Sequence, residues 1–293
     1  MDLLDELQSR VLCGDGAMGT LLLEQGIPAE ICLEELCLTE PERVRAIHDQ
    51  YIGAGARVIE TNTFGANAVR LERHGLESHV GEINRVAAQI AMTSARGKDV
   101  YVAGSVGPLG LTGEEAALRG IDREHCFHEQ LCGLLEGGVD LMFFETFTDF
   151  EEMESAVQAW KKIGKGLALC SFACSPEGRL RSGMPLEAAI WKVRALGVSL
   201  VGVNCIDGPK ATVELLRRLP AQGVIAVYPN AGFPQCIDGR RVYPFAPEEF
   251  SRSAGELVAQ GARLVGGCCG TTPAHVAALA VAIAGSGVDR QRE

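Results

Sequence analysis

Two adjacent cysteines, Cys268 and Cys269, stand between glycines in the run Gly-Gly-Cys-Cys-Gly-Thr-Thr-Pro at 266–273. A third cysteine, Cys205, follows Val203-Asn204 at the end of another apolar run. Three thiolates can hold Zn²⁺ and leave one tetrahedral position open, as catalytic zinc sites do. A structural zinc would need a fourth protein ligand, and no Cys-x-x-Cys or His-x-His lies nearby at finger spacing. The sequence therefore predicts an enzyme that activates a thiol, with these three cysteines as metal ligands.

The other cysteines have a simpler interpretation, because free cysteines are commonly small buried residues. We expect burial for five of them: Cys13, Cys126, Cys132, Cys170 and Cys174. A redox role for the adjacent pair is an alternative. A disulfide between neighbouring residues is strained, however, and the pair lacks the two-residue spacer of thioredoxin-like motifs.

Charge and composition narrow the class of partner. The 293 residues carry a net charge of −11, which argues against nucleic acid or an acidic membrane surface as the main partner. Eleven irregularly spaced cysteines in a long chain without a signal peptide predict a reducing, cytoplasmic location. No apolar run approaches the roughly 20 residues of a membrane span. A small molecule or another protein is the expected partner.

The elements that must position the cysteines form a regular series. Eight short apolar segments recur: 11–15, 58–62, 100–105, 141–145, 167–172, 200–204, 224–229 and 264–268. Continuous apolar runs without alternation are typical of parallel strands buried on both faces. Helical patterns separate most of them: 41–53, 80–94, 151–162, 186–196, 212–219 and 248–260. Eight such units without a composition break predict an α/β fold, a single (β/α)₈ TIM barrel over residues 1–293, with the polar end 285–293 disordered.

An open doubly wound sheet with an appended domain is the competing fold. It would need a G-x-G-x-x-G fingerprint after the first strand, and Gly14, Gly16 and Gly19 have that spacing. Asp15 would then stand beside a pyrophosphate and repel it, and the second strand begins far downstream. The dinucleotide site therefore stays a minor alternative.

Polar residues end most of the predicted strands, where a barrel carries its catalytic groups. The carboxylates of Asp15 and Glu145 could accept hydrogen bonds from an ammonium group, although a helix cap or a rim ion pair would also explain them. Backbone amides of Ala17, Met18 and Gly19 could bind a carboxylate, as helix N-termini do. These groups together describe an amino-acid pocket. No lysine ends a strand, which disfavours Schiff-base chemistry, and the six histidines fall in helices or loops.

Seven motifs along the chain resemble those of the zinc-dependent homocysteine S-methyltransferases. They are Asp-Gly-Ala-Met-Gly-Thr at 15–20, Glu-Thr-Asn-Thr-Phe at 60–64, Gly-Ser-Val-Gly-Pro at 104–108, Glu-Thr at 145–146, Gly-Val-Asn-Cys at 202–205, Tyr-Pro-Asn-Ala-Gly at 228–232 and Gly-Cys-Cys-Gly at 267–270. The resemblance implies a (β/α)₈ barrel with homocysteine as substrate and Zn²⁺ on the three cysteines. It further implies that Asp15 and Glu145 hold the amino group, that the turn Ala17, Met18, Gly19 and Thr20 with Thr63 holds the carboxylate, and that Asn230 lies close to the metal.

The methyl donor is less constrained. The run 60–67, Glu-Thr-Asn-Thr-Phe-Gly-Ala-Asn, looks most like the homocysteine domain of cobalamin-dependent methionine synthase and of bacterial fusions with methylenetetrahydrofolate reductase. The chain has no Asp-x-His-x-x-Gly motif and no second barrel. Methylcobalamin would therefore arrive on a corrinoid or folate-binding module of another polypeptide or of a segment outside this sequence.

Three alternatives remain open at this point. The donor could be S-methylmethionine or betaine, with the zinc chemistry unchanged. The chain could be a non-catalytic thiol- or metal-binding module that docks to a corrinoid protein. It could also be a phosphate-binding isomerase or lyase, because glycine-rich turns after strands seven and eight commonly cradle phosphate.

Overall fold

The computed structural model describes residues 3–219, 225–237 and 240–285. Each of the eight predicted apolar segments contains a strand. Their bounds are β1 Leu12–Cys13, β2 Val58–Glu60, β3 Tyr101–Val106, β4 Leu141–Phe147, β5 Leu167–Phe172, β6 Leu200–Asn204, β7 Ala226–Tyr228 and β10 Leu264–Val265. Several strands are shorter than predicted, because the polar residues that end the segments leave the sheet to face the barrel mouth.

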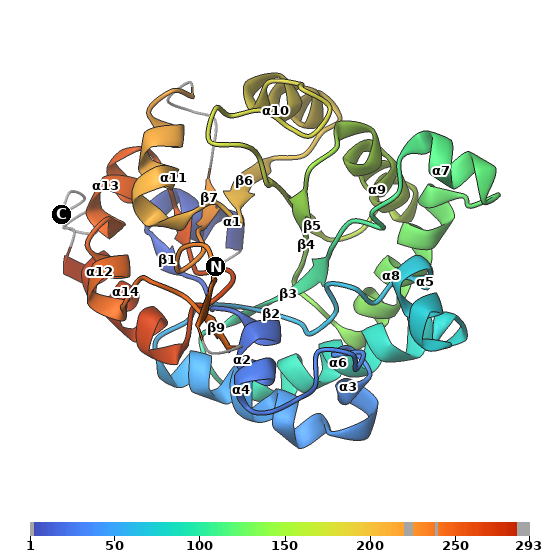
Figure 1. Cartoon of the computed structure of the whole chain (residues 1–293), viewed down its shortest axis with the longest axis horizontal. Coiled ribbons are helices and arrows are strands. Elements are labelled where there is room, and N and C mark those ends of the chain that lie inside the picture. Colours follow the sequence, from blue (N-terminus) through green and yellow to red (C-terminus); the bar gives the residue numbers. More distant parts are fainter. Residues whose placement is uncertain (1–2, 220–224, 238–239, 286–293) are drawn as a thin grey trace.

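All eight strands form one parallel sheet in the order β1-β10-β7-β6-β5-β4-β3-β2. The sheet closes on itself, because Gly14 bridges to Val58 and the Arg57 amide donates to the Cys13 carbonyl at 2.7 Å. Helices surround the strands (Figure 1). The predicted (β/α)₈ barrel is confirmed, and the open doubly wound sheet is excluded.

Four predicted helices agree closely with the structure: α4 Pro41–Gly53, α6 Val80–Ala95, α9 Phe150–Ile163 and α10 Leu186–Ala195. Further helices, not predicted, are α1 Leu3–Ser9, α2 Met18–Glu24, α3 Leu36–Thr39, α5 Ala68–Leu71, α7 Gly113–Leu118, α8 Arg123–Gly137 and α14 Pro273–Gly285, with 3₁₀ turns at Glu72–His74 and Glu77–His79. α9 shows how local sequence sets a boundary. Asp149 caps its first turn by accepting from the Glu152 amide, and Gly164 ends it with a φ of 68°.

Two helix predictions need correction. The helix predicted at 212–219 is α11, Gly208–Leu216, which starts earlier because Pro209 is favourable in a first turn. The helix predicted at 248–260 is two helices, α12 Pro247–Ser251 and α13 Ala254–Ala259. Both α12 and α13 contact α14 and α11.

The interior of the barrel is filled by one apolar side chain or more from each strand. These are Leu12, Val58, Ala103, Leu141, Phe143, Leu169, Leu200, Ala226, Tyr228 and Leu264. Leu3 and Leu7 of α1 join the same cluster, so α1 covers the amino-terminal end of the barrel. A second, larger cluster lies between the sheet and the outer helices. Burial of both clusters removes most of the apolar side chains from water.

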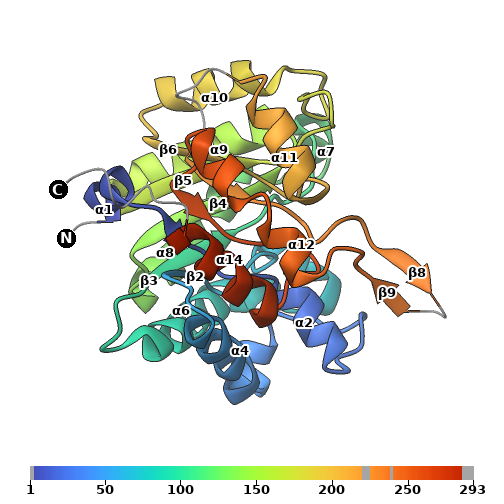
Figure 2. The ribbon, with the colours of Figure 1, turned by 90° about the vertical axis from the view of Figure 1, so that its left-hand side faces the viewer.

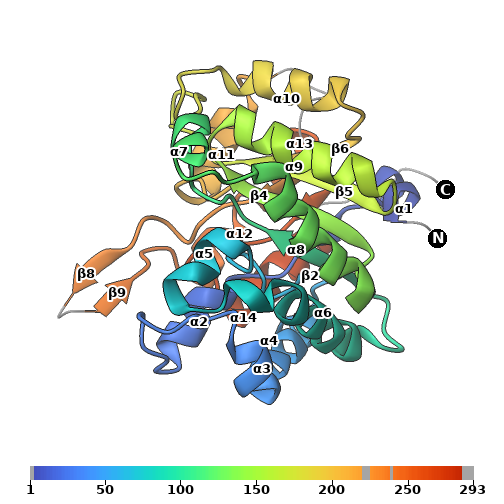
Figure 3. The ribbon, with the colours of Figure 1, turned by 90° about the vertical axis from the view of Figure 1, so that its right-hand side faces the viewer.

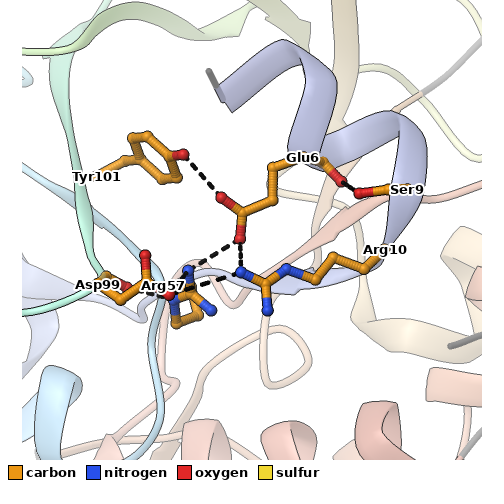
Figure 4. A network of polar contacts seen from close by, with 6 residues as sticks. All are labelled: Glu6, Ser9, Arg10, Arg57, Asp99 and Tyr101. Carbon is orange, nitrogen blue, oxygen red and sulfur yellow. Dashed lines mark hydrogen bonds and ion pairs between the residues drawn. The ribbon is translucent and has the colours of Figure 1, made fainter. Parts of the chain in front are cut away.

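A polar network fastens α1 to the barrel (Figure 4). The buried carboxylate of Glu6 accepts from Arg57 at 2.9 Å and from the Tyr101 hydroxyl at 2.7 Å, and it also pairs with Arg10. Arg57 in turn pairs with Asp99 at 2.7 Å. Burial opposes the charge on Glu6, but these donors outweigh burial and lower the pKa of Glu6.

A two-stranded antiparallel hairpin, β8 Gln235–Ile237 and β9 Arg240–Val242, interrupts the series after β7. It projects from the side of the molecule opposite α1 (Figures 2 and 3). Within the described ranges, no helix has the length and apolar character needed to cross a membrane. Of the stretch predicted to be disordered, Gly285 ends α14, and 286–293 lie outside the described residues.

Candidate functional site

A pocket of about 540 Å³ opens among the loops that follow the carboxyl ends of the strands. Ten of the eleven predicted site residues line it: Asp15, Ala17, Met18, Gly19, Thr20, Thr63, Glu145, Cys205, Cys268 and Cys269. These residues come from five separate stretches of the sequence. The fold therefore brings together residues that were predicted to follow the strand ends. They lie at the carboxyl end of the barrel, where (β/α)₈ enzymes carry their active sites.

The three predicted metal ligands meet at one point. The sulfur atoms of Cys205, Cys268 and Cys269 all lie within 4.8 Å of one another, and the Cys205 and Cys269 sulfurs are 4.0 Å apart. Within the part of the chain that the structure describes, no other three Cys, His, Asp or Glu side chains converge in this way. Cys205 directly follows β6 with a φ of 59°, and its amide donates to the Tyr228 carbonyl at 3.0 Å.

The loop that carries Cys268 and Cys269 is held by its backbone. Every amide from Gly266 to Thr271 donates to an oxygen of the protein. The acceptors are the carbonyls of Val227, Asp15, Pro229 and Cys268 and the side chains of Asn230 and Thr20. Because no amide of this loop is free, it offers no backbone cradle for phosphate, and the phosphate-binding alternative loses its support here.

The electrostatics of the cluster call for a cation. For Cys205, a hydrogen bond with Cys268 lowers the pKa, but a hydrogen bond with Cys269, burial and the charge of Glu145 outweigh it and raise the pKa to about 12. Contacts with Cys205 and Cys269, together with burial, raise the pKa of Cys268 well above its ordinary value. The thiols of Cys205 and Cys268 thus resist ionisation on their own. A divalent ion with a preference for sulfur would supply the missing positive charge, so this donor set fits Zn²⁺.

Three carboxylates face the same pocket at its inner side. The Asp15 carboxylate accepts from the Glu60 amide at 2.8 Å, and Glu145 accepts from the Ser105 hydroxyl and touches the carboxyl group of Glu60. None of the three forms an ion pair with any described residue. Three acids without a basic partner form a receptor for a cation.

Burial is the largest influence on each of these acids and raises its pKa. Repulsion from Glu145 adds to the rise for Asp15 and Glu60. Hydrogen bonds from Ser105 and Glu60 partly offset burial for Glu145. The cluster is therefore electrostatically unfavourable without a positive charge among its members.

Glu60 is the functional candidate that the sequence analysis did not single out. It lies in the run Glu-Thr-Asn-Thr-Phe, which was noted for its resemblance without a role for its acid. An available signal was its position: Glu60 is the last residue of β2, at the same barrel end as Asp15 and Glu145. Because Glu60 ends an apolar strand segment, the hydrophobic pattern alone does not indicate that its side chain reaches the pocket.

The predicted carboxylate-binding turn is also at the pocket. The Ala17 amide already donates to the Thr271 hydroxyl at 3.1 Å, whereas Met18 and Gly19 open helix α2, whose N-cap makes no side-chain hydrogen bond. First-turn amides have no partner within their helix. The Thr63 hydroxyl donates to the Ser105 carbonyl at 2.7 Å, so Thr63 contributes to the wall of the pocket.

Asn230 is the one predicted site residue that does not line the pocket. The side-chain oxygen of Asn230 accepts from the backbone amide of Cys269 at 3.1 Å, and the backbone amide of Asn230 donates to the Ile206 carbonyl at 2.9 Å. Asn230 thus connects the segment after Cys205 to the loop that carries the other two cysteines.

The remaining cysteines and histidines lie elsewhere. Cys13, Cys126 and Cys170 are buried as predicted, while Cys132 and Cys174 are only partly buried. All eleven cysteines fall within the described ranges and none forms a disulfide, so the adjacent pair is not oxidised to one. No histidine is among the residues that line the pocket.

Comparisons with known proteins identify the family of the chain. A sequence model of the family described as homocysteine S-methyltransferase matches residues 12–283. The chain is 35% identical to the methionine synthases of Mycobacterium tuberculosis and Mycobacterium leprae, over 97% of its own length. It spans about a quarter of the length of these two relatives, since the alignments cover 25% of each.

Solved structures give the same result for the fold. The metallated form of the homocysteine methyltransferase MmuM from Escherichia coli superposes with a TM-score of 0.77 at 27% identity, covering 95% of this chain and 98% of that one. A methyltransferase from Methanosarcina mazei superposes with a TM-score of 0.60 at 13% identity, which supports the fold alone.

Proposed function

Because the chain belongs to the homocysteine S-methyltransferase family, we propose that it transfers a methyl group to the sulfur of homocysteine and forms methionine. One observation carries the proposal: a cluster of three thiols and a cluster of three unpaired carboxylates share one pocket. The first cluster suits a thiol substrate and the second suits an ammonium group. Homocysteine carries both groups on one short chain.

The carboxylates Asp15, Glu60 and Glu145 would bind the ammonium group. Placing this cation among them relieves the repulsion that raises the pKa values of Asp15 and Glu60, so binding and electrostatic relief favour the same arrangement. The amides of Met18 and Gly19, beside Thr20 and Thr63, would receive the substrate carboxylate. The amino-acid end of the substrate is thereby oriented before its sulfur reacts.

Cys205, Cys268 and Cys269 are the residues that would hold Zn²⁺. The ion would supply the positive charge that allows the substrate thiol to lose its proton at neutral pH. The protein contributes alignment, because the pocket fixes the amino-acid end and the cysteine loop fixes the opposite end. The substrate sulfur forms its bond to the methyl carbon while the bond from that carbon to the donor breaks and leaves its electron pair with the donor. Such alignment is worth several kcal/mol in effective-molarity terms.

We propose methylcobalamin as the donor, presented by a corrinoid module outside the barrel. The support is the 35% identity to methionine synthases that are about four times longer than the matched segment, so most of their length lies in other modules. We further propose that residues 1–293 form one homocysteine-binding domain and act in the cytoplasm, where free thiols such as these persist.

A second candidate donor rests on a separate observation. MmuM, which is itself named a homocysteine methyltransferase, is matched over 98% of its length. A small sulfonium or betaine donor, such as S-methylmethionine, would need no additional module. The exposed opening of the pocket would accept it directly.

The test is methionine production by zinc-loaded protein with homocysteine and, in separate reactions, methylcobalamin, S-methylmethionine or betaine. Methionine from methylcobalamin, with loss of its spectrum, supports the first donor, and methionine only from a sulfonium or betaine supports the second. Cys268→Ala should abolish bound zinc and turnover together. Cys170→Ala, a buried cysteine outside the pocket, is the matched control and should keep both. No methionine from any donor would reject the enzymatic proposal and favour a non-catalytic thiol-binding module.

A further inference from the structure

Asn204 is a fully buried polar residue, 1% exposed, at the last position of β6. It precedes the metal-ligand candidate Cys205 and lies across from Glu145 and Thr146 on β4. Among the described residues, Thr146 and Cys205 are the only two non-glycine residues with a positive φ, 61° and 59°. Asn204 is thus adjacent in sequence to one of these two residues and hydrogen-bonded to the other.

Four hydrogen bonds fix the side chain of Asn204. Its Oδ1 accepts from the Thr146 amide at 2.9 Å and from the Ser171 hydroxyl at 2.7 Å. Its Nδ2 donates to the Thr146 hydroxyl at 2.6 Å and, more weakly, to the Glu145 carboxylate at 3.4 Å. Because a backbone amide can only donate, the atom that faces Thr146 N must be the oxygen, and this assigns the orientation of the whole carboxamide.

The left-handed conformation is unfavourable for residues with a Cβ and persists only where surrounding contacts hold it. At Thr146 those contacts include the hydrogen bonds with Oδ1 and Nδ2 of Asn204. Thr146 lies in β4 where the pairing with β5 shifts register between Phe144 and Phe147, and the side chain of the preceding Glu145 reaches the pocket. Because the side chain of Asn204 is held, the position of the next residue, Cys205, is also restricted. Cys205 has a positive φ, and its sulfur lies beside those of the other two cysteines.

We propose that Asn204 is a positioning residue that holds the ammonium-binding Glu145 and the zinc-binding Cys205 in register with each other. The carboxamide of Asn204 keeps a fixed distance between Glu145, which would bind the amino group, and Cys205, which would lie near the sulfur. This distance matches the length of the substrate. The inference rests on the proposed function, because it assumes that both ends bind one molecule.

A buried asparagine could also serve stability alone, and the chain offers a matched control. Asn84 on α6 is equally buried, donates to the carbonyls of Ala66 and Val80 at 2.7 and 2.8 Å, and is not among the residues that line the pocket. Asn84→Ala and Asn204→Ala each remove a buried carboxamide. Only the second should alter the site.

The experiment measures zinc affinity by competition with a chromogenic chelator, and kcat and KM for homocysteine with the donor that supports turnover. Asn204→Ala should weaken zinc binding about 10- to 100-fold, the usual effect of losing a group that orients a ligand, and raise KM about 10-fold. Adding Thr146→Gly should restore KM, because glycine adopts a positive φ unaided, while zinc affinity stays low. Asn84→Ala should change neither quantity.

Unchanged zinc affinity and KM in folded Asn204→Ala would overturn the proposal, as would equal losses in Asn84→Ala. If Asn204→Ala does not fold, Asn204→Asp replaces it: this variant keeps the acceptor for Thr146 but brings a negative charge to Glu145. It should raise KM at least 10-fold, and an unchanged KM would reject the idea. If the unaltered protein makes no methionine, the proposed function fails separately, and zinc competition still decides the role of Asn204.

Discussion

Glu60 provides the clearest residue-level prediction. Glu60→Gln keeps the shape of the side chain and removes one of the three carboxyl groups that would face the ammonium group of homocysteine. A hydrogen bond to a charged partner contributes about 1.5–3 kcal/mol, so we expect KM for homocysteine to rise roughly 10- to 100-fold. Zinc content should not change, because Glu60 is not among the converging ligands. Steady-state kinetics and metal analysis on the same preparation test both expectations.

Glu152 is the matched control for Glu60. It is also a buried glutamate, but it accepts from the Gly110 amide at 2.9 Å and lies outside the pocket. Glu152→Gln should leave KM unchanged. A rise in KM of the same size in both variants would show that loss of any buried charge disturbs the site, and the role assigned to Glu60 would be lost.

At this scale, residue type and position predicted most of the residues that line the pocket, while their roles stay predictions. Cys268 and Cys269 stand out because adjacent cysteines between glycines have few structural explanations, and Cys205 stands out because it ends another apolar run. Glu60 does not stand out, since an acid inside a strand segment looks like an ordinary strand residue until its neighbours are known. Asn204 was also beyond reach, because its role depends on contacts with β4 that are distant in sequence.

Helix α4 carries an element-level prediction about acid stability. Its His48 is fully buried with no hydrogen-bond partner for either ring nitrogen, and burial lowers the pKa of His48 to about 4. The unfolded chain protonates His48 near pH 6.5 and the folded chain resists it. The contribution of His48 to the free energy of unfolding is therefore fully present above pH 6.5. It falls by about 1.4 kcal/mol per pH unit between pH 6.5 and 4.

Replacing His48 with Leu should remove this part of the pH dependence, so the variant should lose less stability than the original protein between pH 7.5 and 5. Urea unfolding at both pH values, with a chelator present, gives the comparison. His125→Gln, at an exposed position on α8, should leave the slope unaltered. Parallel slopes for His48→Leu and the original protein would contradict the assignment.

Among the elements, the strands were predictable because their apolar runs are buried on both faces. Helix α4 was predictable from its apolar stripe and the proline in its first turn, and α9 from its apolar stripe and clear caps. Helix α8 was missed because its buried face includes Gln130, Gly133 and Gly137. The two glycines allow close approach to α6: a Cβ at Gly137 would lie 2.3 Å from that of Ala88. Close packing of this kind dilutes the hydrophobic pattern on which sequence prediction relies.

At the scale of the whole molecule, the two ends of the barrel have separate tasks. The Glu6 network stabilises the closed end, and the pocket occupies the other. Glu6→Gln removes a buried charge from its contacts with Arg57 and Tyr101, and we expect a loss of about 1–3 kcal/mol in the free energy of unfolding. The KM for homocysteine should stay the same. Urea unfolding and kinetics on one preparation measure both.

Glu256→Gln is the control for this prediction, because Glu256 pairs with Arg217 and both side chains are more than half exposed. Its loss should cost less than about 1 kcal/mol. A similar cost for both variants would mean that α1 is held by its leucines alone. The lowered pKa of Glu6, like that of His48, makes the free energy of unfolding decrease in acid. The contribution of Glu6 is present above about pH 4.5 and is lost as the pH falls further.

The loop from Gly266 to Thr271 has its shape before any thiol is engaged, because all six of its amides are already bonded to oxygen atoms. An ion that binds the two cysteines of this loop, as proposed, would therefore meet a backbone that its own hydrogen bonds already hold, and binding would leave the peptide units where they are.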